Sequence, residues 1–208
     1  MIIQTFKEYR FTCKVALFIL LLSPLFLLSI DVVYNDLGPD PAKATAHITG
    51  DWAMRLLLMT LAISPLKKLT GSTEWVYYRR MLGLFTFFYA SLHLLTYAFL
   101  LFGLEWHQLW ADVLYRPYIT IGFFAWLMLV PLALTSSRGS QRRLGRRWSQ
   151  LHQCIYIALL LAFLHLVWQV RSDLSEALVY GCIVLFLMSF RSEKILLGVR
   201  RLSRLFSK

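Results

Sequence analysis

Six long apolar segments occupy most of this 208-residue chain. A helix needs about 20 apolar residues to cross the hydrocarbon of a bilayer, and only the last segment is near the short limit. Helices also satisfy their backbone hydrogen bonds within one segment. The sequence therefore predicts an all-α polytopic membrane protein, a six-transmembrane-helix bundle in a single domain over 1–208, with no visible internal repeat. The predicted spans cover about 12–30, 48–66, 81–103, 117–136, 150–170 and 174–190.

The composition excludes a large soluble domain. The chain is 58% hydrophobic, whereas soluble domains are typically 45–50% apolar. Any flavin, nicotinamide or molybdenum chemistry that needs a soluble fold must therefore come from a partner. The three cysteines are isolated and form no CxxC motif, so they indicate neither a disulfide framework nor a zinc or iron–sulfur site.

The basic residues predict the orientation of the helices. The N-terminus, the 67–80 and 137–149 loops and the C-terminal tail carry 18 of the 22 Lys and Arg residues. Cytoplasmic loops are enriched in Lys and Arg, so we expect both termini in the cytoplasm. The net charge of +11 is explained by this topology and does not indicate nucleic-acid binding.

Three histidines, His93, His152 and His165, lie inside or at the edge of the apolar segments. An ionisable side chain in hydrocarbon is costly and usually faces the bundle interior at a functional site. Imidazole is also a common axial ligand of haem iron. A single such histidine can equally serve as a helix–helix hydrogen-bond partner, but three on two parallel spans favour haem ligation.

The depth of each histidine can be estimated from the basic residues that precede its span. His93 lies 13 residues beyond Arg80 and His165 lies 18 beyond Arg147, which is about 20 Å and 27 Å along a helix. His152 lies only five residues beyond Arg147, at about 8 Å. We therefore expect His93 and His165 to ligate one b-type haem, while His152 supports a second haem or an inner relay.

Three arginines are candidate partners of the cofactors. Arg55 lies about one turn into the second span from its outer side, where a haem propionate is a plausible partner and snorkelling to the interface is the alternative. Arg79 and Arg80 could bind an inner propionate or a flavin phosphate, but a solvated basic cluster that obeys the positive-inside rule is the favoured explanation.

Seven short motifs are spread over most of the chain. They are 49–53 (TGDWA), 60–66 (TLAISPL), 78–84 (YRRMLGL), 89–93 (YASLH), 116–122 (RPYITIG), 131–136 (PLALTS), and Leu151 and His152 followed by His165. In this order they resemble the MsrQ (YedZ) family over nearly the whole length of the chain. MsrQ proteins are haem-binding membrane subunits within the ferric-reductase-like transmembrane superfamily, and the resemblance implies that the three histidines match the family's haem-associated positions.

The resemblance implies a subunit of the MsrPQ methionine sulfoxide reductase system in the bacterial inner membrane. Electrons would come from the quinol pool or a cytoplasmic flavin reductase and would pass to MsrP, a periplasmic molybdopterin enzyme that repairs oxidised methionines in envelope proteins. FMN is implied as a further cofactor by resemblance alone. The chain itself would be an electron-transfer subunit without a substrate-reducing site. The alternatives are a stand-alone transmembrane ferric or metal reductase and a histidine-based proton channel or transporter.

Overall fold

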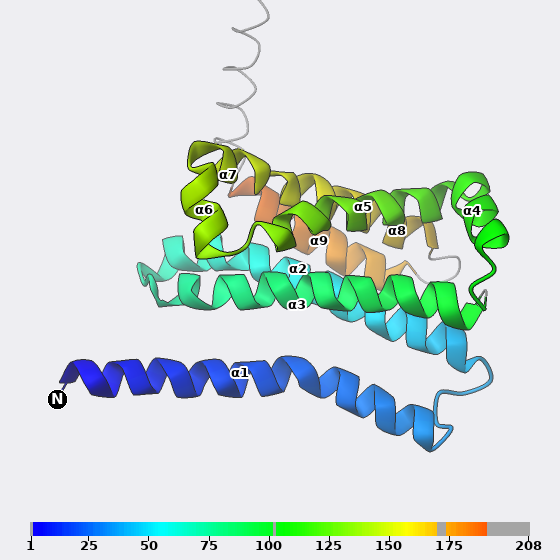
Figure 1. Ribbon diagram of the computed structural model, residues 1–208, viewed down its shortest axis with the longest axis horizontal. Coiled ribbons are helices and arrows are strands. Elements are labelled where there is room, and N and C mark those ends of the chain that lie inside the picture. Colours follow the sequence, from blue (N-terminus) through cyan, green and yellow to red (C-terminus); the bar gives the residue numbers. More distant parts are fainter. Residues whose placement is uncertain (1, 102, 170–173, 191–208) are drawn as a thin grey trace, which may run out of the picture.

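The computed structural model describes residues 2–101, 103–169 and 174–190, and its described elements are all helices (Figure 1). This agrees with the predicted all-α class. The helices are α1 (Ile2–Val33), α2 (Pro41–Thr70), α3 (Glu74–Thr96), the π-helix η1 (Tyr97–Leu101), α4 (Trp106–Tyr115), α5 (Pro117–Leu134), α6 (Arg138–Leu144), α7 (Arg146–Leu151), α8 (Cys154–Gln169) and α9 (Ser175–Ser189).

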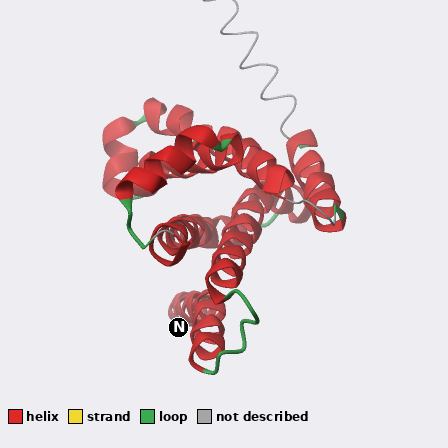
Figure 2. Ribbon diagram, turned by 90° about the vertical axis from the view of Figure 1, so that its right-hand side faces the viewer, coloured by secondary structure: helices red, strands yellow, loops and turns green. Residues whose placement is uncertain are grey.

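Two helical pairs form the body of the bundle. Helix α2 packs mainly against α3, and α5 packs mainly against α8. Helix α9 contacts both α2 and α8, whereas α1 contacts α2 and α3 from the edge of the bundle (Figure 2). The short helix α4 lies across one end of the bundle, and α6 and α7 lie at the opposite end (Figure 1).

Local sequence signals explain where the paired helices begin and end. Asp40 caps α2 by accepting a hydrogen bond from the Lys43 backbone N–H at 3.0 Å, and a proline occupies the first helical position, where its missing N–H costs nothing. Gly71 ends α2 with a φ of 68°, a conformation that glycine adopts without steric strain. Helix α5 likewise opens with Pro117, directly after Arg116.

Four stretches of the described residues are long and apolar enough to cross a membrane: Tyr9–Val33, Glu74–Leu101, Pro117–Leu134 and Arg146–Gln169. The predicted span 48–66 lies within α2, but Asp51 and Arg55 lower its hydropathy. The predicted span 174–190 corresponds to α9, a helix of 15 residues, which is about 22 Å long. These findings support a multi-pass membrane protein, and the count of six spans stays a prediction.

The basic residues gather at one end of the bundle. The turn between α2 and α3, the helices α6 and α7 and the start of α1 all lie at one end of the bundle (Figure 1). Most of the Lys and Arg residues that the structure describes belong to this end, in α1, α2, α3, α6 and α7. Its assignment to the cytoplasm follows from the positive-inside rule and stays a prediction.

The core between α2, α8 and α9 is centred on Leu159, whose side chain is fully buried. We expect Leu159→Ala to lower the free energy of unfolding by about 2 kcal/mol, because packing contacts are lost and a cavity remains. The neighbouring Leu160 is 51% exposed, so Leu160→Ala is the matched control and should cost less than about 0.5 kcal/mol. Reversible unfolding in mixed detergent micelles measures both values, and equal losses would contradict this packing.

Candidate functional site

His93 and His165 come from different helical pairs and meet inside the bundle. His93 lies in the last turn of α3, and His165 lies near the end of α8. Their ring centroids are 6.1 Å apart, the ring planes make an angle of 70°, and both side chains are partly buried. The structure thus brings together the two histidines that their estimated depths pair.

One ring nitrogen of each histidine is held by a backbone carbonyl. His93 Nδ1 lies 2.8 Å from the Ala46 oxygen, and His165 Nδ1 lies 2.7 Å from the Tyr118 oxygen. A carbonyl oxygen can only accept a hydrogen bond, so each Nδ1 carries the proton and each Nε2 keeps its lone pair. Ligating histidines are usually oriented in this way, because the second hydrogen bond fixes both the tautomer and the ring.

A glycine faces each imidazole and leaves room for it. A Cβ atom on Gly122 would lie 2.8 Å from His165 Nδ1, and one on Gly50 would lie 3.0 Å from His93 Nδ1. Cβ atoms essentially never lie as close as 2.8 Å to a non-bonded atom, and 3.0 Å is tighter than an ordinary van der Waals contact, so a Cβ atom at either position would require the ring to shift. Each ring therefore packs directly on the backbone of the neighbouring helix, at a position where any larger residue would displace it.

The two halves of the site share the same spacing along the chain. Each carbonyl lies 47 residues before its histidine, and each glycine follows the carbonyl residue by four positions. This local repeat of one carbonyl, one glycine and one histidine was not predicted from the sequence. The signal that could have revealed it is the equal separation of Gly50 from His93 and of Gly122 from His165.

The arrangement fits a haem iron held between two imidazoles. A metal–nitrogen bond of about 2 Å on each side, together with the size of an imidazole ring, places two axial rings about 6 Å apart. The observed centroid distance is 6.1 Å. Each ring also keeps the lone pair of Nε2, and this nitrogen is the atom that would bind the iron.

His152 lies apart from this pair, at a break between two helices. Helix α7 ends at Leu151 and α8 begins at Cys154, so His152 falls in the turn between them. Its Nδ1 lies 3.1 Å from the Trp148 oxygen and its ring stacks on the Trp148 ring, with centroids 4.0 Å apart. Arg79 is close enough to act electrostatically on His152, whereas Arg80 is exposed.

Arg55 contacts other side chains of α2 and α9. Its Nε donates a hydrogen bond to the Tyr180 hydroxyl at 3.2 Å, and its guanidinium lies 3.9 Å from Asp51 and 4.0 Å from Glu176. The Trp52 ring lies beneath it, 5.3 Å from the guanidinium carbon. The structure therefore gives Arg55 protein partners of its own, and neither His93 nor His165 is among the contacts described.

Comparison with known proteins first defines the class. The profile of the family described as ferric reductase like transmembrane component matches residues 49–163, a range that contains α3, α5 and most of α2 and α8. The chain belongs to this family of membrane proteins. No solved structure matches it.

Curated relatives narrow the class to one family. The chain is 51% identical to a protein of Xanthomonas campestris pv. campestris (strain B100) over 168 residues, 81% of this chain and 77% of the relative. It is 51% identical over 76% of its length to a protein of Xanthomonas axonopodis pv. citri (strain 306), 72% of which is covered, and 49% identical over 81% to one of Xanthomonas euvesicatoria pv. vesicatoria (strain 85-10), 77% of which is covered. Each is called "Protein-methionine-sulfoxide reductase heme-binding subunit MsrQ". This chain is a member of the MsrQ family.

Proposed function

We propose that this chain is a b-type cytochrome subunit that binds haem between His93 and His165. One observation carries the proposal: two imidazoles from different helical pairs lie 6.1 Å apart, and each has its Nδ1 held by a backbone carbonyl. The relatives named above are called heme-binding, which supports the same cofactor here.

The residues of the chain would hold the cofactor and set its properties. The hydrogen bonds to the Ala46 and Tyr118 carbonyls fix the two ring orientations and increase the basicity of each Nε2. Gly50 and Gly122 allow the rings to lie against the helix backbones. When bound, the haem supplies the one-electron chemistry, and the protein sets its depth, surroundings and potential.

Further binding sites belong to the same proposal. His152 would support a second haem or an inner relay, and Arg79 near it would contact a propionate or a flavin phosphate together with Arg80. Arg55 would pair with a propionate of the haem at His93 and His165, in exchange for its present contact with Asp51 or Glu176. FMN binding rests on family resemblance.

We propose that electrons enter from the quinol pool or a cytoplasmic flavin reductase and leave to a periplasmic molybdopterin methionine sulfoxide reductase, MsrP. The relatives are called subunits of a protein-methionine-sulfoxide reductase, which implies a catalytic partner. His93 and His165 lie near the C-terminal ends of α3 and α8. These helix ends lie at the end of the bundle that is opposite α6 and α7 (Figure 1), so a haem there would be near the outer face of a bacterial inner membrane.

Electron transfer to the proposed partner can be measured directly. Purified protein is reduced anaerobically, its haem spectrum is followed by stopped flow, and oxidised MsrP is added. We expect rapid reoxidation by MsrP and at least 10-fold slower reoxidation by ferric citrate at the same concentration. Faster reoxidation by ferric citrate would instead indicate a stand-alone ferric reductase. A haem-free protein that conducts protons in liposomes would indicate a histidine-based channel.

A further inference from the structure

Tyr118 contacts His165 through both its backbone and its side chain. The Tyr118 carbonyl accepts the hydrogen bond from His165 Nδ1 at 2.7 Å, and the two rings stack with centroids 6.2 Å apart and planes 26° apart. The corresponding residue beside His93 is Ala46, which has no ring. The plane of His165 is therefore fixed by a contact that His93 lacks at the corresponding position.

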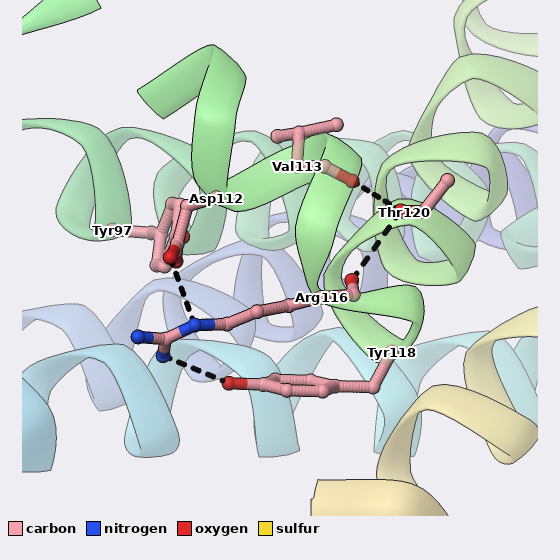
Figure 3. A network of polar contacts seen from close by, with 6 residues as sticks. All are labelled: Tyr97, Asp112, Val113, Arg116, Tyr118 and Thr120. Carbon is pink, nitrogen blue, oxygen red and sulfur yellow. Dashed lines mark hydrogen bonds and ion pairs between the residues drawn. The ribbon is translucent and has the colours of Figure 1, made fainter. Parts of the chain in front are cut away.

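A chain of polar contacts holds Tyr118 in turn (Figure 3). Arg116 Nη1 donates to the Tyr118 hydroxyl at 3.3 Å, and Arg116 Nε lies 2.8 Å from Asp112 Oδ1. The second oxygen of Asp112 accepts a hydrogen bond from the Tyr97 hydroxyl. These residues come from η1, from α4 and from the start of α5, so the chain of contacts joins three elements at one end of the bundle.

The Asp112 carboxylate is much better protected from solvent than the guanidinium that it binds. Its side chain is 12% exposed, whereas that of Arg116 is 56% exposed. An ion pair open to solvent contributes little to stability by itself. The Arg116–Asp112 ion pair serves to orient the side chains, because the Asp112 carboxylate is held by Tyr97 and in turn restricts the guanidinium that contacts Tyr118. Thr120 reinforces the junction through a hydrogen bond from its hydroxyl to the Val113 carbonyl of α4.

We propose that Tyr97, Asp112, Arg116 and Tyr118 form a positioning network that sets the ring plane of His165, and with it the angle between the two axial imidazoles of the haem. This inference rests on the haem site proposed above. None of the four side chains would contact the iron itself. They act through His165, and their effect would be on the electronic structure and retention of the haem.

Three substitutions separate the contacts of the network. Tyr118→Leu removes the stacked ring and leaves the carbonyl, and Tyr118→Phe removes only the hydroxyl. Arg116→Lys keeps the charge but loses the planar guanidinium that contacts Asp112 and Tyr118 together. Lys43→Gln is the control for replacing an exposed basic residue outside the network, because Lys43 is exposed and lies in the first turn of α2.

The readouts are the electron paramagnetic resonance spectrum of the ferric protein and the rate at which haem is released to apomyoglobin. We expect Tyr118→Leu and Arg116→Lys to shift the low-spin signal and to accelerate release about 2- to 10-fold, which is the range for losing one net hydrogen bond or a packing contribution of similar size. Tyr118→Phe should have the smallest effect of the three, and Lys43→Gln should match the wild type.

Folding is checked by circular dichroism, so that loss of structure is separated from loss of positioning. Wild-type spectra and release rates in folded Tyr118→Leu and Arg116→Lys proteins would overturn the network while leaving the haem site intact. A wild-type protein that binds no haem would overturn the proposed site itself and the network with it. A shift confined to the network variants, with Lys43→Gln unchanged, is the outcome that supports the inference.

Discussion

Replacing either His93 or His165 with alanine is expected to abolish the signal of the b-type haem that the two residues bind in the purified protein. Each variant removes one of the two imidazoles, whose ring centroids lie 6.1 Å apart. The remaining imidazole can bind the iron from one side only. We expect haem content at this site to fall by at least 10-fold. A reduced-minus-oxidised optical spectrum with a pyridine haemochrome assay measures the loss.

His152→Ala is the control for these two substitutions. His152 lies in the turn between α7 and α8, with its ring on Trp148, and is therefore not part of the pair. This variant should keep the haem held by His93 and His165, even if a second haem is lost. Full haem content in His93→Ala and His165→Ala, together with loss in His152→Ala, would contradict the proposed ligand pair.

Gly122→Ala is expected to remove most of the haem, although neither proposed ligand is replaced. The new Cβ would lie 2.8 Å from His165 Nδ1 and 2.9 Å from Cε1, so the ring must move, and its 2.7 Å hydrogen bond to the Tyr118 carbonyl would be strained or broken. Gly50→Ala should displace His93 in the same way but should remove less haem, since its Cβ atom would lie 3.0 Å from His93 Nδ1 and 3.1 Å from Cε1. Haem content and the rate of haem release to apomyoglobin are the measurements.

Gly83→Ala is a matched control in the same bundle. A Cβ atom at Gly83 would meet only Thr60 Cγ2, at 3.6 Å, which is an ordinary van der Waals contact. We therefore expect Gly83→Ala to retain the haem content of the wild type. If Gly122→Ala and Gly83→Ala behave alike, the fit of His165 against the α5 backbone has no role in haem binding.

The pairing of His93 with His165 could be predicted because it depends on a single regular quantity. The rise of a helix is constant, so the distance of a residue from the basic end of its span gives its depth. By this measure His93 is closer in depth to His165 than to His152, and the structure brings the first two together. Estimating depth needs no knowledge of how the helices pack.

The surroundings of the two histidines could not be predicted in the same way. The carbonyls of Ala46 and Tyr118 are backbone groups, which leave no mark in the amino-acid sequence, and they become partners only through the packing of α2 on α3 and of α5 on α8. Glycine has many roles, so Gly50 and Gly122 stand out only when their equal separation from the histidines is noticed.

The breaks within the predicted spans could not be predicted for a different reason. Apolar content predicts length, but it does not show a helix break. The segment 150–170 contains the turn at His152, and the segment 81–103 changes from an α-helix to a π-helix at Tyr97. The turn at His152 and the π-helix at Tyr97 differ from an α-helix in their backbone hydrogen bonds, which the hydropathy of the side chains does not reveal. π-Helical turns are frequent at functional sites, and this one carries Tyr97 of the positioning network.

The most direct test of the central claim is the electron paramagnetic resonance spectrum of the ferric wild-type protein. Two imidazole ligands whose planes are 70° apart should give a strongly anisotropic low-spin signal, which nearly perpendicular rings produce and parallel rings do not. The account predicts this signal for at least one haem per chain and its persistence in His152→Ala. A haem-containing protein that shows only a high-spin signal, as one imidazole ligand would give, would contradict it.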